Sequence, residues 1–528
     1  FRRVLFRSFQ ALADEMQRSM DSLRVEGQPA PFIIDYRLQR SQEVNINATL
    51  GQLYTFDLQP VSQTLEAQVI LGDYHLSSLR APNPDMHGSG IPGALDYDNL
   101  RRQAWLDTDT RYKQAITAFE GKKEDLRKVT RPKDEEDLDD FFPAQPVTSI
   151  QKRSPETLDL RADELARYVS RLSLIAYEFP SLTESTARLS LKQADIYRLT
   201  SEGVRVAQPQ DDILTVSFNF HLYRSTSGSN HYSTYEQHYA TPAEALADST
   251  HFIQSAREYI ARRLSALNDS VAEDYYVGPL LIEDKAGRLI YNIANYGGYR
   301  FYASHRFTES SRDTYLRLNH KIVDEKITIR QDPTLSQWEG KPLTGYYTAD
   351  ANGQKPQAVT LVERGIFRSQ ICGATPALGT PAPTGNMRFN NPFVWNSPMG
   401  ATTVPGVVRI ESSKTMSLGK MRRQLLRDAQ REGYDHAYLK RGEFLFRIST
   451  KDGSESLIGI RDFSPTAQHL RHISALSSEQ EAVEMNGSFG GARFTVVGPR
   501  AMLLNDIELP VATPGQQAKP VLTFPLKR

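Results

Sequence analysis

A chain of 528 residues is too long for a single hydrophobic core, so its length predicts two or three domains. Lys and Arg together number 63, as do Asp and Glu, and this balance argues against a protein that binds nucleic acid or a membrane surface. The single cysteine excludes an internal disulfide, and no apolar run reaches the roughly 18 residues that a membrane-spanning helix needs.

The N-terminal part of the chain is predicted to be an α+β region over residues 9–130. Amphipathic spacing indicates a helix over 9–23, and a charge-rich helical stretch covers 94–128. Between them, apolar and alternating runs predict strands over 32–38, 43–54 and 64–74.

The first eight residues, FRRVLFRS, resemble one translated frame of a sequencing-adapter tail. We therefore expect residues 1–8 to be non-native and leave them out of the fold prediction. On that interpretation the true N-terminus, together with any signal peptide, is missing from the sequence.

A charged and proline-punctuated stretch over 131–158 is predicted to be a connector. Residues 159–270 then continue the N-terminal α+β domain, with a helix over 161–177 followed by a β-meander over 186–239. Thr241 and Glu244 form a capping box that opens another helix, which ends near residue 268.

Strand signals dominate the rest of the chain, residues 271–528. Three helices interrupt them, over 283–296, 418–432 and 467–475. The predicted class is therefore α+β: an N-terminal α/β two-layer domain followed by a mostly β C-terminal domain that is barrel-like or sandwich-like.

The helix predicted over 283–296 is the most informative part of the sequence. A short apolar strand leads into it through Glu283 and Asp284, which suit the positive end of a helix. Apolar residues recur with the spacing of one buried helical face at Ala286, Leu289, Ile290 and Ile293. Gly297 and Gly298 then favour an end to the helix.

This arrangement resembles the TldD/PmbA family, also called modulators of DNA gyrase. The downstream landmarks have the same order and spacing as in that family: 332–335 (DPTL), 345–347 (GYY), 358–369 (AVTLVERGIFRS) and 383–388 (PTGNMR). The resemblance runs from about residue 277 to the C-terminus. Weaker upstream matches at 31–41, 72–74 and 105–112 resemble larger, often exported relatives, and favour a periplasmic or secreted location.

In the family, the helix carries a His-Glu-x-x-x-His motif in which the histidines bind zinc and the glutamate is the general base, and a cysteine far downstream is a third ligand. The resemblance places the first histidine of the motif on Asn292, the glutamate on Ile293 and the second histidine on Gly297. Zinc in proteins is held by thiolate, imidazole or carboxylate, and isoleucine cannot accept a proton. The only cysteine, Cys372, lies more than a hundred residues before the end of the chain. We therefore expect no zinc and no catalytic residue at these positions.

Two interpretations of this segment stay open. It is either a structural helix retained after catalysis was lost, or a remodelled site that binds an extended peptide through Tyr291, Asn295, Tyr296 and Tyr299. Asn292 is a further hydrogen-bonding candidate in the second interpretation.

The resemblance implies a non-catalytic protein that binds an extended peptide or an unfolded protein segment, or that forms a homodimer or a heterodimer with a paralogue. The family's known heterodimer offers a precedent, since one of its subunits carries the motif and the other lacks it. One alternative is an active metallopeptidase with a non-standard site, for which Cys372, or His469 together with His472, are the only candidates. A structural, envelope-associated protein is the other alternative.

Overall fold

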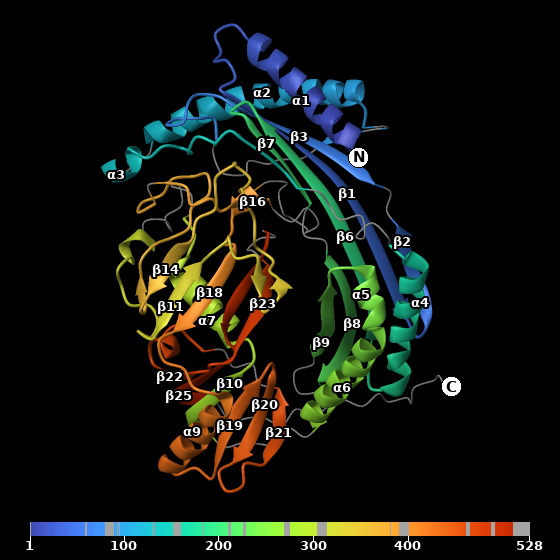
Figure 1. Ribbon diagram of the computed structural model, residues 1–528, viewed down its shortest axis with the longest axis vertical. Helices are drawn as coiled ribbons and strands as arrows, with labels where there is room; N and C mark the ends of the chain where they lie inside the picture. Colours follow the sequence, from blue (N-terminus) through green and yellow to red (C-terminus); the bar gives the residue numbers. More distant parts are fainter. Residues whose placement is uncertain are drawn as a thin grey trace.

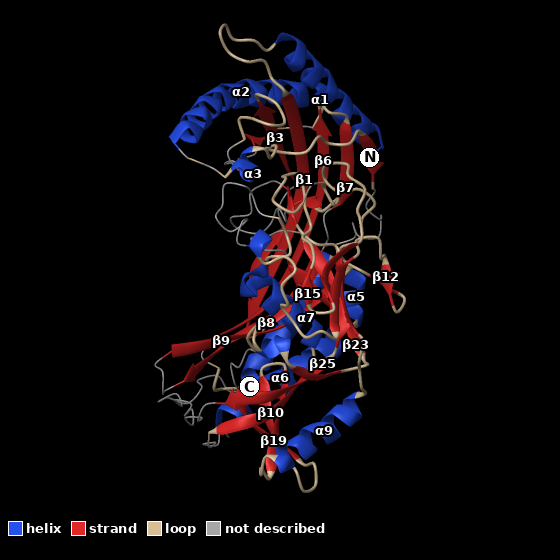
Figure 2. Cartoon of the chain, turned by 90° about the vertical axis from the view of Figure 1, so that its left-hand side faces the viewer, coloured by secondary structure: helices blue, strands red, loops and turns tan. Residues whose placement is uncertain are grey.

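The computed structural model describes residues 2–58, 61–79, 89–91, 93, 95–128, 130, 132–151, 160–182, 184–209, 213–224, 229–268, 275–303, 314–380, 382–389, 401–460, 465–486 and 492–509. The molecule is elongated, with helices α1 and α2 at one end and α9 at the other (Figures 1 and 2).

A long, curved antiparallel sheet forms the N-terminal part. Its centre is the pair β1 (Ile33–Thr49) and β6 (Glu184–Thr200), two strands of 17 residues each. One half of the sheet adds β3 (Ser62–Ile70), β4 (Ser89–Gly90), β7 (Val204–Pro209) and β5 (Val147–Ile150). The other half adds β2 (Gln52–Leu58) beside β1, and β8 (Ile213–Arg224) and β9 (Ser229–Tyr239) beside β6.

Helices cover the outer face of this sheet (Figure 1). At one half these are α1 (Arg2–Ser22) and α2 (Tyr97–Lys128); at the other they are α4 (Ala162–Ser173), α5 (Pro242–Ala247) and α6 (Ser249–Asn268). Two short helices, α3 (Lys133–Glu136) and the 3₁₀ turn η2 (Leu174–Glu178), complete this part. Along β1 the even-numbered residues Ile34, Tyr36 and Leu38 are buried against the helices, as the period of two requires. The predicted two-layer arrangement is confirmed.

Two six-stranded sheets build the C-terminal part. The first has the order β21 (Glu455–Ile460), β20 (Phe444–Ser449), β19 (His436–Arg441), β10 (Tyr276–Glu283), β25 (Ala501–Leu509), β22 (Ile473–Leu476). The second has the order β15 (Ile366–Phe367), β14 (Val359–Glu363), β11 (Ile327–Gln331), β18 (Val407–Ser412), β24 (Arg493–Pro499), β23 (Gln480–Asn486). Two small hairpins pair β12 (Gln337–Trp338) with β13 (Lys341–Pro342) and β16 (Met387–Phe389) with β17 (Ala401–Thr403).

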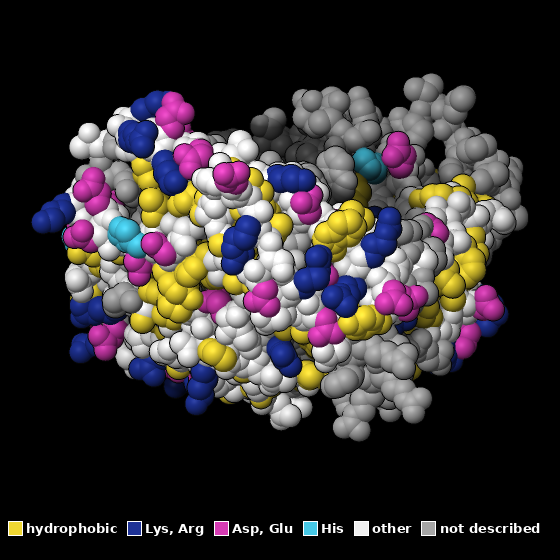
Figure 3. All heavy atoms as spheres, turned by 90° about the horizontal axis from the view of Figure 1, so that it is seen from above, with side chains coloured by type: hydrophobic (Ala, Val, Ile, Leu, Met, Phe, Trp, Pro, Cys, Tyr) yellow, Lys and Arg dark blue, Asp and Glu magenta, His cyan; other side chains and the backbone are white. Residues whose placement is uncertain are grey.

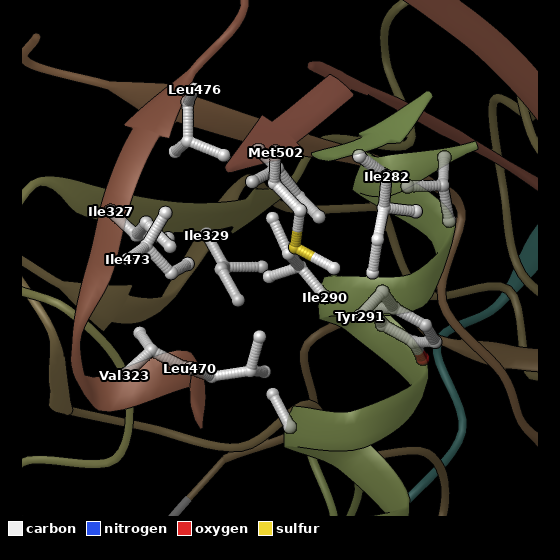
Figure 4. Packing of buried hydrophobic residues seen from close by; sticks show 14 of the residues in the cluster. Ile282, Ile290, Tyr291, Val323, Ile327, Ile329, Leu470, Ile473, Leu476 and Met502 are labelled. Atoms are coloured by element: carbon white, nitrogen blue, oxygen red, sulfur yellow. The ribbon is translucent and has the colours of Figure 1, made fainter. Parts of the chain in front are cut away.

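The main core of the C-terminal part lies between these two sheets and is completed by helix α7 (Ala286–Ala294). Ile282 and Met502 from the first sheet meet Ile327 and Ile329 from the second beside Ile290 of α7 (Figure 4). The opposite face of the first sheet is covered by α9 (Leu418–Arg431). The α+β class is confirmed, and the two sheets are open rather than closed into a barrel.

The two parts of the chain contact each other at both ends of the curved sheet. At one end the Arg198 guanidinium is held by Asp35 of the same sheet, with Nη2 and Oδ2 2.8 Å apart, and donates to the carbonyl of Ala351 and to Oδ1 of Asn352 in the C-terminal part. At the other end, Tyr259 of α6 donates to Glu443, which precedes β20, at 2.6 Å. The Arg198 contacts are buried, whereas Glu443 keeps about a third of its side chain exposed.

Surface charge is mixed where it can be seen. Over α1 and α2, acidic and basic side chains alternate with apolar ones, and no block of a single sign forms (Figure 3). This agrees with the balanced composition. Within the described residues, no helix is long and apolar enough to cross a membrane.

Candidate functional site

Strand β10 and helix α7 form the region that the sequence singles out. Glu283 ends β10 and is buried, and its carboxylate accepts from Arg422 of α9 at 2.7 Å and from Arg441 of β19 at 3.0 Å. Burial alone would raise the pKa of Glu283, but the two guanidinium groups hold it below its ordinary value. Glu283 therefore ties α9 to the first sheet, and α7 begins three residues later, at Ala286, rather than at Glu283 as predicted.

The apolar face predicted for the helix is confirmed. Ala286, Ile290 and Ala294 are fully buried in the C-terminal core. Gly287 lies so close to β24 that an added Cβ would stand 3.0 Å from Cα of Gly498. Ile293, at the position of the family's general base, is partly buried and packs against the same core. The side chain at this position packs against apolar neighbours and cannot accept a proton.

A π-turn, η3 (Asn295–Tyr299), continues α7. It closes with a hydrogen bond of 3.0 Å from the Arg300 amide to the Asn295 carbonyl, five residues back. Two ligands spaced five residues apart are separated by roughly 1.4 turns of an α-helix, so they diverge unless the helix widens. The widened turn of this chain includes Gly297, the position on which the sequence resemblance places the second histidine of the motif.

The backbone at Gly297 could carry a side chain. An added Cβ would meet only the Cβ of Ala467, at 3.7 Å, which is an ordinary van der Waals contact. The φ angle of Gly297 is not in the left-handed region. Packing therefore does not require glycine at this position.

The residues at these positions do not fit a zinc ion. Asn292 offers a neutral amide, Ile293 a hydrocarbon and Gly297 no side chain, whereas zinc takes imidazole, thiolate or carboxylate. Oδ1 of Asn292 is buried and has no hydrogen-bond partner among the described residues. Across the described part of the chain, no three His, Cys, Asp or Glu residues cluster in a way that could hold a metal.

Two of the four predicted peptide-binding residues are buried and make contacts within the protein. Tyr291 is 2% exposed and packs edge-on against Phe494, and burial raises the pKa of its hydroxyl. Asn295 is 1% exposed, and its Oδ1 accepts from the Phe301 amide at 2.8 Å. Neither side chain reaches the surface, because one fills the core and the other holds the exit of the π-turn.

Of the other two predicted residues, Tyr296 faces outward, whereas Tyr299 packs partly against the C-terminal core. Tyr296 is 56% exposed. Tyr299 is half-buried: its hydroxyl accepts from Arg471 at 3.1 Å, and the guanidinium of Arg317 lies 5.5 Å from its ring centroid. The surface of the π-turn therefore combines exposed aromatic area with two arginines.

Cys372 does not suit a catalytic role. It is fully buried, its thiol donates to the carbonyl of Thr375 at 3.0 Å, and burial raises its pKa to about 12. A thiol with such a pKa is protonated at neutral pH and a poor nucleophile.

The helix predicted over 467–475 is wrong. In its place are a 3₁₀ turn, η4 (His469–Arg471), and strand β22. His472 follows the turn and has a non-helical φ of −138°, so His469 and His472 do not share a helical face. His469 Nδ1 accepts from the Thr466 amide at 2.9 Å, and burial lowers the pKa of this histidine.

The sequence interpretation missed a buried charged cluster on the inner face of the curved sheet. Asp35, Arg37, Glu66 and Arg198 are all at least 94% buried. Arg37 stands between Glu66 of β3 and Arg198 of β6 in the pairing register. Burial raises the pKa of Glu66 to about 7, and neither of its carboxylate oxygens has a hydrogen-bond partner among the described residues. The sequence signal for this cluster was the run of polar residues at odd-numbered positions of β1, which includes Asp35 and Arg37.

The sequence of residues 303–424 matches the family described as PmbA/TldA metallopeptidase C-terminal domain. The matched region contains the landmarks at 332–335, 345–347, 358–369 and 383–388, and it begins after α7 and the π-turn. No curated protein matches the sequence.

The fold is similar to three solved structures. TldE from Thermococcus kodakarensis aligns with a TM-score of 0.55 and 13% identity, covering 95% of this chain and all of the other. A putative modulator of a DNA gyrase from Thermotoga maritima aligns with a TM-score of 0.53 and 12% identity, covering 96% of this chain and all of the other. A putative modulator of DNA gyrase from Bacteroides thetaiotaomicron aligns with a TM-score of 0.52 and 10% identity, covering 94% of this chain and 98% of the other. The resemblance inferred from the sequence is confirmed by the domain match and by the fold of the whole chain.

Proposed function

Because the chain has the C-terminal domain and the fold of the PmbA/TldD proteins, we propose that it is a non-catalytic relative of these metallopeptidases. It acts as a subunit that binds an extended peptide, an unfolded protein segment or a partner chain. A periplasmic or secreted location belongs to the same proposal. The observation that carries it is the set of side chains at positions 292, 293 and 297.

Loss of the chemistry follows from those side chains. Hydrolysis by a zinc peptidase needs an ion to polarise the carbonyl and a base to take a proton from water. Here the base position holds Ile293, packed against the core, and neither Asn292 nor Gly297 offers an imidazole nitrogen or an anionic donor for zinc.

Peptide binding is supported by what the segment keeps. Tyr296 and Tyr299 give an aromatic surface, and Arg317 and Arg471 beside Tyr299 would attract carboxylates of a peptide. The unpartnered Oδ1 of Asn292 is an acceptor that a small rearrangement would offer to a peptide N–H. Pairing of the peptide backbone with a sheet edge is the usual way to hold an extended segment.

Two assays on the purified chain test this function. In the first assay, the purified chain should leave unfolded peptides uncleaved, both in the presence of added zinc and in the presence of a chelator. A panel of extended acidic and neutral peptides should raise the melting temperature, because a ligand that binds only the native state stabilises it. Substitution Arg471→Ala should weaken the response to acidic peptides more than to neutral ones. Chelator-sensitive cleavage would contradict the loss of catalysis, and a melting temperature unmoved by every peptide would contradict the binding role.

One alternative is an enzyme with a non-standard site, and the other is a structural, envelope-associated protein. The candidates for the enzyme were Cys372 and the pair His469 and His472, and the structure places the thiol in the core and separates the histidines from a common face. If peptide cleavage is nevertheless observed, Cys372→Ala and His469→Ala decide whether either residue is responsible.

A further inference from the structure

An open pocket of about 420 Å³ lies where the hairpin of β1 and β2 meets the start of β6 and the turn η2. Helix α4 lies beside β2 at this edge of the sheet (Figure 1). The pocket belongs to the N-terminal part of the chain, whereas α7 and its π-turn belong to the C-terminal part, so its ligand does not depend on the proposed function. Its lining has an apolar group, Leu50, Tyr54, Ala176 and Leu182, and a polar group, Thr49, Glu184, Ser185 and Thr186.

A β-bulge directs Tyr54 into this pocket. The pairing of β1 with β2 shifts between Asn47 and Ala48, and Tyr54 is the extra residue of β2. Its hydroxyl oxygen lies 3.5 Å from Oγ1 of Thr186, on the face of β6 opposite to the buried Ala187. The bulge thus places the tyrosine on the inner face of the sheet, where it is 59% exposed and available to a ligand.

The turn between β1 and β2 has a backbone that bulky residues rarely adopt. Leu50 has a φ of 49°, and Gly51, next to it, has a φ of 82°. The Gly51 amide donates to Oγ of Ser173 at 2.8 Å, and the Gly51 carbonyl accepts from Ser170, so α4 holds the turn through both groups. Strain of this kind persists only where the surroundings enforce it, and it is concentrated at binding sites. Here it fixes Leu50 as one wall of the pocket.

The polar side of the pocket is negatively charged. Among the described lining residues, Glu184 is the only charged one, and its side chain is 73% exposed. Its Oε2 lies 3.8 Å from Nε2 of His221 on β8, which is beyond hydrogen-bond distance. Thr49 donates its hydroxyl proton to the carbonyl of Ser185 at 3.0 Å, so the Thr49 oxygen remains an acceptor. The described lining therefore offers a carboxylate and a hydroxyl oxygen, but no cationic side chain.

We propose that this pocket binds an organic ammonium ion that carries a short alkyl chain. The ammonium group donates to Glu184 and Thr49 and lies against the ring of Tyr54, because a cation is attracted to the face of an aromatic ring. The alkyl chain covers the apolar residues of the lining and takes them out of water. A neutral ligand of the same shape gains only the second contribution, so the pocket selects the cation.

Ligand-observed saturation-transfer NMR on the full chain tests this proposal with three probes. Butylammonium represents a free amine, acetyl-lysine amide represents a lysine side chain of a polypeptide, and acetyl-norleucine amide is the uncharged counterpart of the second probe. At least one of the two cations should bind with a dissociation constant of about 1–10 mM, as expected for a small ligand with few contacts. The uncharged probe should bind at least about fivefold more weakly. Binding of butylammonium alone supports a free amine as the ligand, and binding of acetyl-lysine amide alone supports a lysine side chain.

Two substitutions test the position of the site. Glu184→Gln removes the charge and keeps the shape of the side chain, and Tyr54→Leu removes the aromatic ring. Each should raise the dissociation constant of the cation at least about threefold. Melting temperatures should stay close to wild type, because both side chains are mostly exposed.

Glu120→Gln is the matched control, since it removes a carboxylate of α2 that is 60% exposed and lies over the other half of the sheet. It should leave the dissociation constant unchanged. High salt should weaken binding to wild type more than to Glu184→Gln, because the charge interaction is screened. The proposal is overturned if neither cation binds, if the uncharged probe binds as tightly, or if the two pocket substitutions leave binding unchanged.

Discussion

Helix α7 and the inner face of the curved sheet differ in the polar groups that they bury. At α7 the positions that carry zinc chemistry in the family hold an amide, an aliphatic side chain and glycine, and the surroundings are those of an ordinary core. On the sheet, four ionisable side chains are buried together, and one of them joins the two parts of the chain. The comparison separates a helix that holds no ionisable side chain at these three positions from a sheet in which buried charge supports the structure.

The largest effect is expected where charge supports the structure. Arg198→Ala leaves the buried Asp35 with Arg37 alone as an ion-pair partner among the described residues, and it breaks the contacts to Ala351 and Asn352. Loss of one member of a buried ion pair costs about 3–5 kcal/mol. Denaturant unfolding should show that loss in the free energy of unfolding.

Arg257→Ala is the matched control for that change. Arg257 also makes a two-pronged pair, with Glu178, but both side chains are more than a third exposed. It should cost only about 0–1 kcal/mol. Equal losses in the two variants would mean that the buried cluster has no special role.

Two asparagines sharpen the comparison within the α7 segment. Asn295→Ala leaves the Phe301 amide buried without its acceptor, at a cost of about 1–3 kcal/mol. Asn292→Ala removes an amide whose Oδ1 has no partner among the described residues, so stability should be unchanged or slightly higher. Thermal unfolding of the two variants side by side measures the difference, and an equal loss in both would show that Asn292 has a structural hydrogen bond.

Glu66 predicts a pH effect that follows from its burial. Its pKa is raised to about 7 in the folded chain from an ordinary value of 4.5, so folding favours the protonated form. The corresponding stability is fully present below about pH 4.5 and is lost as the pH rises toward 7. Glu66→Gln should flatten this decline between pH 5 and 7. If wild type and variant have parallel stability profiles over that range, the burial of Glu66 is not coupled to its protonation.

The sequence predicted the fold class, the helix-covered sheet and the buried face of α7, because those depend on apolar periodicity, which is local. It could not show that Asn295 is used by the π-turn, since that depends on the Phe301 amide meeting its side chain. The charged cluster was also hidden: Asp35 and Arg198 are 163 residues apart, and only the pairing of β1 with β6 brings them together. The error at 467–475 has a similar cause, because strand β25 recruits Ile473–Leu476 as β22 and overrides a weak helical pattern.

A gain of zinc binding is expected when the side chains of the family's motif are introduced at these positions. The triple variant Asn292→His, Ile293→Glu, Gly297→His should fold with reduced stability, because residue 297 has room for a side chain whereas Ile293→Glu places a carboxylate against the core. It should bind zinc weakly, because the third ligand of the family is still missing. Calorimetric titration should detect this binding in the variant and none in wild type, with Gly297→Ala as the control for the backbone change.

The most direct measurement is anomalous X-ray scattering at the zinc edge from crystals of the wild-type chain soaked in zinc without chelator. Replacement of the ligands at positions 292 and 297 predicts no anomalous peak beside α7 and its π-turn. A strong peak there, within about 2.3 Å of protein donor atoms, would show that the chain still holds the metal by other means and would contradict the account.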